Sequence, residues 1–330
     1  MRYSSRFFLY LPFGILLLLA AVLSIYWIVA SRELEKKLDA LNGQAIAPGV
    51  TLHFAKREVG GFPFRLDAVM EKVILEVKRA NGPMRWSAEK FALHVLSYAP
   101  GPMVFEAAGK QTLEWTGENA VAKRFEFQSA SLRASAVRHD GRLSRFDLDS
   151  TGLRWEGGQA LRFQGHIRRN PDADVLDFAI TGDGVQVKDS PFGAQFAHAA
   201  ITGTVSDADA FDALMTGSED WRVALERWRA RKNSRAETQT KISATNAQVS
   251  AKGSLWLDRY HRPTGKADAH VTLALPRLDF AQSDGADSLS ASLLAIAAAS
   301  ASTPATVPIS IADGYVRVGG LPAASAPPLY

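Results

Sequence analysis

The hydrophobic pattern divides the chain into one long apolar segment and a β-rich remainder. Residues 7–30 contain no charged side chain. At about 1.5 Å per residue, a helix over this range is about 36 Å long, whereas the hydrocarbon core of a bilayer is about 30 Å thick. Leu34, Leu38 and Leu41 continue the helical spacing as far as Gly43. The pattern therefore predicts a transmembrane anchor over 7–30, followed by a helical stalk over 31–43.

A cleaved signal peptide and a buried core helix are the alternatives to an anchor. The apolar stretch of a signal peptide is about 7–15 residues long and ends at a small-x-small site. Here the stretch is longer, and it ends at Ile28-Val29-Ala30, which matches such a site poorly. Basic residues flank both ends of the segment, so charge alone does not decide its orientation. We expect an inner-membrane protein with a short cytoplasmic tail over 1–6 and its bulk in the periplasm.

From residue 44 to residue 205 the pattern changes to short runs that alternate apolar and polar residues. The runs are interrupted by turn-forming pairs and triplets, among them Pro100-Gly101-Pro102, Asp140-Gly141 and Asp183-Gly184. These features predict about ten antiparallel strands. Residues 236–330 return to the same pattern, with a hairpin at Asp313-Gly314 and an Ala/Ser-rich segment over 281–305 that has some helical character. A sheet this large must curl, close or pair with a second layer.

Residues 206–235 have a helical period and are expected to form a small insertion. Ser206 and Asp209 resemble a capping box, which predicts a first helix that ends at Gly217. Ser218 is expected to begin a second helix, with Trp221 and Trp228 on one face. The predicted fold is therefore mainly β: a transmembrane helix, then a large curved antiparallel sheet with a small helical insertion.

Composition excludes several classes of function. Lys and Arg number 38 against 34 Asp and Glu, a net charge of +4, which is not typical of a nucleic-acid-binding protein. The chain has no cysteine, so thiol catalysis and cysteine-ligated zinc are excluded. The seven histidines form no HExxH motif, and no Gly-x-Ser-x-Gly motif is present. Two aspartate clusters lack the Gly and Glu of an EF-hand loop. We therefore predict no metal, no cofactor and no enzymatic activity.

Two segments are candidate binding surfaces. The rings of Phe62 and Phe64 flank Pro63 and are expected either to line a ligand groove or to wedge one strand against its neighbour. The tryptophans of the second helix, Trp221 and Trp228, are expected either to pack on the sheet or to face a partner. A basic group follows the same helix and would suit an anionic lipid surface; it comprises Arg222, Arg229, Arg231 and Lys232.

Three features together resemble the bacterial domain-of-unknown-function 2125 family of single-span envelope proteins. The first is the N-terminal apolar helix, and the second is Gly61-Phe62-Pro63-Phe64 some 30 residues after it. The third is a C-terminal hairpin with Asp313-Gly314, Val316, Val318 and Gly319. Gly265-Lys266-Ala267 after Arg262-Pro263 adds to the pattern. The chain is also loosely similar to AsmA-like envelope proteins, a resemblance that implies a role in handling lipid. Neither resemblance supplies catalytic residues.

Three hypotheses about function remain open. The first is a non-enzymatic protein whose curved sheet binds a lipid or acyl chain, or another envelope component. The second is a structural or assembly factor that acts through protein contacts of the Trp221/Trp228 helix and the 281–305 segment. The third is a membrane-anchored hydrolase, which would require a histidine to meet a serine or a carboxylate in one pocket.

Overall fold

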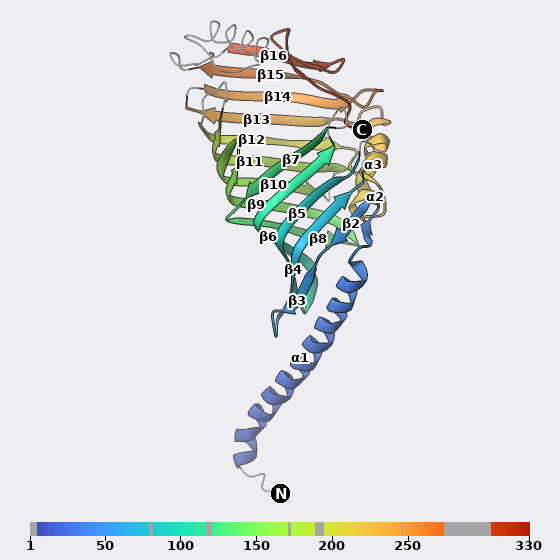
Figure 1. The fold of residues 1–330 in the computed structure, drawn as a ribbon, viewed down its shortest axis with the longest axis vertical. Helices are drawn as coiled ribbons and strands as arrows, with labels where there is room; N and C mark the ends of the chain where they lie inside the picture. The colour runs from blue at the N-terminus through green and yellow to red at the C-terminus, as the bar shows by residue number, and fades with distance from the viewer. Residues whose placement is uncertain are drawn as a thin grey trace.

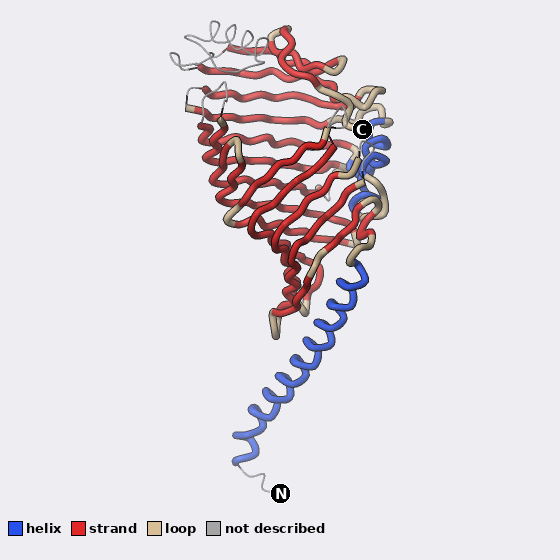
Figure 2. The backbone as a smooth tube through the Cα atoms, viewed as in Figure 1, coloured by secondary structure: helices blue, strands red, loops and turns tan. Residues whose placement is uncertain are grey.

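The computed structural model describes residues 5–78, 82–116, 121–170, 173–188, 195–245, 247–273 and 305–330. It consists of one long helix and one large sheet, with a few short helices at the sheet's edge (Figures 1 and 2). The Ala/Ser-rich segment, up to residue 304, lies outside the described residues.

Helix α1 spans Ser5–Leu41 without interruption and contains Pro12 in its first turns. Among the described residues it is the one helix long and apolar enough to cross a membrane. It ends just before Gly43, whose φ of 79° is the left-handed geometry that glycine adopts at a helix C-terminus. The predicted apolar helix and its stalk are thus confirmed as one element, either a signal sequence or a single membrane anchor.

Most of the other described residues form an 18-stranded antiparallel sheet, in which most strands pair with their neighbours in sequence. The long strand β6 pairs with β7 along one half and with β8 along the other. The strands are β1 Ala45–Ala47, β2 Val50–His53, β3 Lys56–Gly60, β4 Arg65–Val77, β5 Met84–Leu96, β6 Ala99–Thr116, β7 Ala122–Gln128, β8 Ser131–His139, β9 Arg142–Trp155, β10 Gly158–Arg169, β11 Val175–Val187, β12 Gln195–Ser206, β13 Ala236–Ala244, β14 Ala247–Leu257, β15 Pro263–Leu273, β16 Ala305–Ala312, β17 Tyr315–Val318 and β18 Leu321–Ser325.

The sheet curls along its length, as expected for so many twisted strands. Figure 1 shows the blue and cyan strands of its N-terminal half crossing obliquely in front of the green ones, while β13–β16 lie nearly horizontal at the far end. The narrow end of the sheet, with β3, lies beside α1. The predicted mainly β fold, with a curved antiparallel sheet after a long apolar helix, is confirmed.

Local turn signals were only partly reliable. Asp140 and Asp313, with the glycines that follow them, have positive φ and form two-residue hairpin turns, as predicted. The break predicted at Asp183-Gly184 is wrong, because β11 continues through it and Gly184 makes a local irregularity with a φ of 55°. The break predicted at Pro100-Gly101-Pro102 is also wrong. The turn lies just before the triplet, at Ser97-Tyr98, and the triplet belongs to the start of β6, where pairing with β5 is irregular and proline is tolerated.

The helical insertion exists between β12 and β13, but both predicted starts are wrong. Ser206 is the last residue of β12, and its hydroxyl donates to Asp207 rather than capping a helix. A 3₁₀ turn, Ala208–Phe211, leads into α2, Asp212–Met215. Helix α3 spans Trp221–Arg229, and its cap is Asp220, which accepts a 2.8 Å hydrogen bond from the backbone N–H of Arg222.

Candidate functional site: an apolar lane across the sheet

One face of the sheet carries an unbroken row of uncharged residues from β4 to β16. In an antiparallel sheet, residues directly opposite each other point to the same face, so pairing register can be followed from strand to strand. Starting at Ala68 of β4, each residue pairs with the next across twelve strands. The row is Ala68, Leu93, Phe105, Ala134, Leu148, Gly165, Ile180, Ile201, Thr240, Ala251, Ala269 and Val307.

A parallel row lies on each side of this one, two residues along every strand. The first is Met70, Phe91, Ala107, Leu132, Ser150, Phe163, Gly182, Ala199, Ile242, Val249, Val271 and Ala305; the second is Leu66, Val95, Met103, Ala136, Phe146, Ile167, Phe178, Gly203, Thr238, Gly253, Ala267 and Ile309. We call the three rows the apolar lane. None of its residues is charged, and its only hydroxyls belong to Ser150, Thr238 and Thr240.

The opposite face of the same strands is polar. The row that starts one residue earlier, at Asp67, is Asp67, His94, Val104, Ser135, Asp147, His166, Ala179, Thr202, Gln239, Lys252, Asp268 and Pro308. Side chains alternate between the faces of a strand, so the sheet separates apolar from polar residues over this whole width. Charge is absent from the lane because of this separation, not because the strands lack charged residues.

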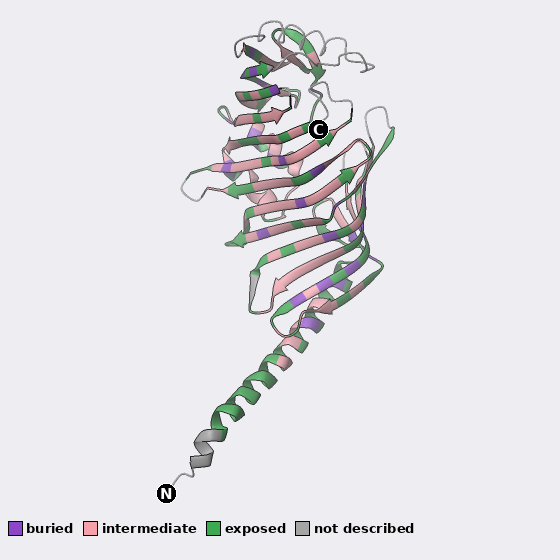
Figure 3. Cartoon of the chain, turned by 90° about the vertical axis from the view of Figure 1, so that its left-hand side faces the viewer, coloured by how far each residue is buried: buried purple, intermediate pink, exposed green. Residues whose placement is uncertain are grey.

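The lane is partly exposed over β10–β12, whereas Ser150, on the neighbouring strand β9, is only 1% exposed. Ile167, Ile180 and Ile201 lie on three successive strands and are 40%, 45% and 42% exposed. Figure 3 shows the sheet with few fully buried residues, in contrast to a closed core. Exposed apolar surface that continues across several strands is uncommon in monomeric soluble proteins and marks an interaction site.

The two ends of the lane are buried. At the β4 end, Ala68 and Met70 are 0% and 1% exposed and pack in a cluster with Leu38 of the α1 stalk, joined by Leu34. At the far end, Ala269, Val271 and Val307 form a second buried cluster with Ala247. Helix α1 therefore leads directly to the first strand of the lane, and Arg57 of β3 stabilises this junction through a 2.7 Å hydrogen bond to Asp39.

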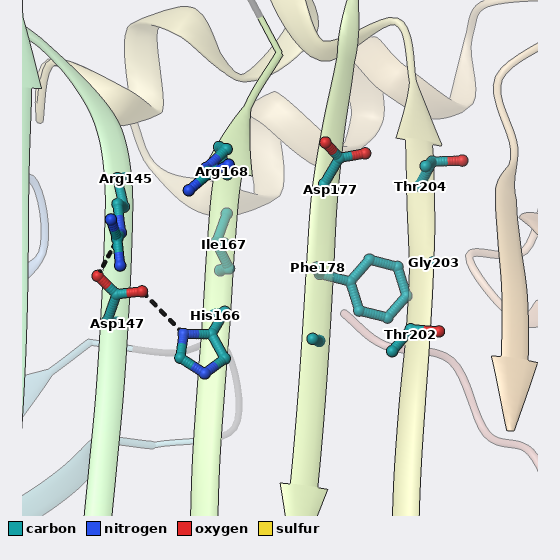
Figure 4. A pocket seen from close by; sticks show the side chains of 11 residues that line it. Arg145, Asp147, His166, Ile167, Arg168, Asp177, Phe178, Thr202, Gly203 and Thr204 are labelled. Carbon is teal, nitrogen blue, oxygen red and sulfur yellow. Dashed lines mark hydrogen bonds and ion pairs between the residues drawn. The ribbon is translucent and has the colours of Figure 1, made fainter. Parts of the chain in front are cut away.

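A cavity of about 500 Å³ lies over strands β9–β12 and is lined by polar side chains together with Ile167 and Phe178 of the lane (Figure 4). Asp147 lies between Arg145, at 2.6 Å, and His166, at 2.8 Å. Burial raises the pKa of Asp147, but the hydrogen bonds from His166 and Arg145 outweigh burial, and the pKa lies below its usual value.

Three histidine–aspartate pairs lie on the polar face. The Nδ1 atom of His94, His166 and His198 is 2.7–2.8 Å from Asp67, Asp147 and Asp183, respectively. No feature of the sequence singles out these histidines, since each partner lies 15 to 27 positions away and only strand register brings it near. Ser135 also meets Asp147, but its hydroxyl donates to the carboxylate, at 3.2 Å. In a serine triad the hydroxyl bonds the imidazole instead.

Phe62 and Phe64 lie in the connection between β3 and β4, just before Leu66 of the lane. The Phe62–Pro63 peptide bond is cis. Both rings are exposed, at 57% and 58%, and Phe62 contacts Trp27 of α1 edge to face, with ring centroids 5.4 Å apart. The structure does not bring this segment together with Trp221 and Trp228, which belong to α3 on a different edge of the sheet (Figure 1).

Helix α3 packs through Trp228 and presents its other face outward. Trp228 is 6% exposed, lies against Phe211, and donates a 2.8 Å hydrogen bond from Nε1 to the carbonyl of Ser206. Ala208 and Ala224 are fully buried beside it, and their small side chains allow the 3₁₀ turn and α3 to approach closely. Trp221 is partly buried and contacts the ring of Tyr330.

Most of the predicted basic group is engaged by carboxylates or aromatic rings. Arg229 pairs with Glu226, and Arg231 pairs with Asp209. The guanidinium of Arg222 lies over the ring of Trp221, 5.3 Å from its centroid. Lys232 is exposed at the end of the helix. The lipid-surface role of this group stays a prediction. Because Arg229 and Arg231 pair with carboxylates, their positive charges are partly neutralised within the protein.

Tyr330 packs against α3 and hydrogen-bonds to it. The Tyr330 hydroxyl donates a 3.0 Å hydrogen bond to Glu226, and its ring stacks on His261 with centroids 4.4 Å apart. The Arg229 guanidinium beside Glu226 holds the pKa of that carboxyl at about 2. Burial, together with the hydrogen bond to Glu226, raises the pKa of Tyr330 to about 12.

These pKa shifts predict a specific pH dependence. Folded Tyr330 holds its proton more tightly than the unfolded chain, so its contribution to stability is complete below pH 10 and is lost as the pH rises toward about 12. We expect Tyr330→Phe to be less stable than the unmodified chain at pH 8, and the difference to disappear by about pH 12. Denaturation midpoints across this range test the prediction, and Tyr315→Phe, at a ring that is 52% exposed, is the control. A difference that stays constant with pH would contradict it.

Comparison with known proteins identifies a family. A model described as "Uncharacterized protein conserved in bacteria (DUF2125)" matches residues 27–327. No curated protein and no solved structure matches the chain. The looser similarity to AsmA-like proteins stays a prediction. The matched range begins at Trp27, the residue that contacts Phe62, and includes the stalk and all of the sheet. Because the match covers nearly the whole chain, the protein belongs to the DUF2125 family, as its sequence resemblance predicted.

Proposed function

We propose that this protein is a non-enzymatic, membrane-anchored envelope protein that binds the acyl chains of a lipid along the apolar lane, with its bulk in the periplasm. The observation that carries the proposal is the lane itself: three register-aligned rows across twelve strands without a charged residue. An acyl chain is a long, flexible, uncharged ligand, and a long, uncharged, half-exposed surface is its complement.

The scale of the interaction is sufficient for binding. Each methylene group removed from water contributes about 0.8 kcal/mol, so a contact of about eight methylenes contributes about 6 kcal/mol before the cost of ordering the chain. Ile167, Ile180 and Ile201 supply exposed side chains on adjacent strands for such a contact. Small residues such as Gly165 and Ala199 lie between larger ones and leave shallow spaces for a chain.

The position of α1 supports retention of the helix as an anchor. A signal peptidase that cut near Ala30 would remove Trp27, which donates a 2.7 Å hydrogen bond from Nε1 to the carbonyl of Arg65. It would also separate the membrane from the stalk, whose Leu34 and Leu38 pack at the first strand of the lane. An uncleaved anchor instead holds one end of the lane close to a source of lipid.

The proposal is tested by identifying what the protein carries. The full chain is extracted from membranes in a mild detergent and purified, and its lipids are recovered and measured by mass spectrometry. We expect at least one phospholipid or other acylated lipid per chain, above the amount retained by an unrelated single-span protein treated in the same way. Equal amounts of lipid on both proteins would refute binding by the sheet.

A further inference from the structure

We infer that the narrow end of the sheet is itself a membrane contact, in which Phe62, Phe64 and Tyr98 enter the interfacial region of the bilayer on the side where α1 leaves it. The inference rests on the proposal that α1 remains in the membrane as an anchor. It goes beyond that proposal because it assigns lipid contact to the folded domain and fixes how the domain stands on the membrane.

Two turns and the anchor helix meet at this end of the sheet. Ser97, in the turn between β5 and β6, donates hydrogen bonds from its backbone N–H and its hydroxyl to the carbonyl of Phe64, both at 3.0 Å. From α1, the Tyr26 hydroxyl donates a 2.7 Å hydrogen bond to the carbonyl of Ser97. The neighbouring Trp27 donates to Arg65 and packs against Phe62. The two turns are thus tied to one level of the helix.

The length of the free helix places that level at the membrane surface. Residues 7–27 of α1 precede the contact, and at about 1.5 Å per residue they span about 31 Å, close to the hydrocarbon core of a bilayer at about 30 Å. The first charged residue after this range is Arg32. Tryptophan and tyrosine are the residues enriched where a transmembrane helix passes the headgroups. Tyr26 and Trp27 therefore mark the interface, and the turns bound to them lie at the same depth.

The side chains that the two turns present suit this environment. Phe62 and Phe64 are 57% and 58% exposed, and Tyr98, beside Ser97, is 70% exposed. Three exposed aromatic rings at the narrow end of the sheet are unfavourable in water, because burying each large apolar side chain lowers the free energy by about 1.5–3 kcal/mol. Amphipathic and aromatic rings are stable at the headgroup level, so the bilayer that holds the anchor is the occupant that this tip fits.

The arrangement can be measured with single fluorescent labels, because the chain has no cysteine of its own. Three variants are labelled with bimane and reconstituted as full chains into phosphatidylcholine vesicles: Leu17→Cys, Phe64→Cys and Tyr315→Cys. Leu17 lies in the middle of the anchor, and Tyr315 belongs to β17 at the far end of the sheet; both are exposed, at 71% and 52%. Each is compared in vesicles with and without lipids that carry a nitroxide quencher, either on the headgroup or in mid-chain.

We expect the label at Phe64 to lose most of its fluorescence with headgroup-nitroxide lipid and the label at Tyr315 to lose none. The label at Leu17 is expected to respond most to the mid-chain nitroxide. If the Leu17 label is quenched but the Phe64 label behaves like the one at Tyr315, α1 is in the membrane and the contact of Phe62, Phe64 and Tyr98 with the bilayer is refuted. If the Leu17 label is not quenched either, the anchor fails, and the inference fails with it.

Discussion

Ile201→Asp is expected to reduce the lipid recovered with the purified protein by about tenfold or more. Ile201 lies in the central row of the apolar lane, between Ile180 and Thr240, and is 42% exposed. A tenfold loss corresponds to about 1.4 kcal/mol, whereas covering a carboxylate with an acyl chain costs several kcal/mol. Since the carboxylate is hydrated in the lipid-free protein, the free energy of unfolding is expected to change by only about 1 kcal/mol.

Thr202→Asp is the matched control for this experiment. Thr202 is the next residue of β12, is also exposed, and points to the polar face because side chains alternate along a strand. The same charge is therefore added to the same strand without entering the lane, and lipid recovery is expected to be unchanged. Equal losses in the two variants would show that the effect is not specific to the lane. No loss in either would mean that the lipid, if any, binds elsewhere.

Trp228→Ala is expected to lower the free energy of unfolding by about 3–5 kcal/mol, as is typical when a large buried aromatic side chain is truncated. Trp228 is 6% exposed, fills the space between α3 and Phe211, and satisfies the carbonyl of Ser206 through Nε1. The substitution leaves both a cavity and an unpaired carbonyl at the end of β12. Because β12 belongs to the middle of the sheet, we expect the substitution to destabilise the sheet as well as the short helices. Urea denaturation followed by fluorescence measures it.

Val223→Ala on the same helix separates a packing role from a general effect of changing α3. Val223 is 51% exposed, and alanine favours a helix at least as well as valine, so a change of about 0.5 kcal/mol or less is expected. If Trp228→Ala were no more destabilising than Val223→Ala, Trp228 would not have the structural role that its burial indicates. A docking role for this tryptophan would then become the better interpretation.

Structural elements that depend on residues close together in the sequence could be predicted from the sequence. The charge-free run from residue 7 to residue 30 predicted the apolar helix, and the spacing of Leu34, Leu38 and Leu41 predicted its extension to Gly43. Asp140-Gly141 and Asp313-Gly314 predicted hairpins because positive φ at two successive residues is a local property. The failures were local too: Asp183-Gly184 has the composition of a turn, yet pairing on both sides of β11 carries the strand through it.

The candidate sites depended more strongly on the fold. Phe62 contacts Trp27, a residue 35 positions earlier, and this contact could not be read from the sequence. A ligand surface at Phe62 and Phe64 stays a prediction. The alternation of apolar and polar residues suggested an apolar face for many strands separately. Whether these faces join depends on register, because a shift by one residue in any strand would have put a polar residue such as Asp147 or His166 into the lane.

The sequence by itself determined the class of this protein: an apolar helix long enough to cross a bilayer, a chain that alternates like antiparallel strands, and membership of the DUF2125 family. These properties follow from composition and from interactions between residues near in sequence. Only the tertiary structure decided that the apolar faces of twelve strands align into one lane, and that α1 packs against both the first strand of the lane and Phe62. Both depend on hydrogen-bond register and on packing between distant segments, and neither leaves a signal in any single stretch of the chain.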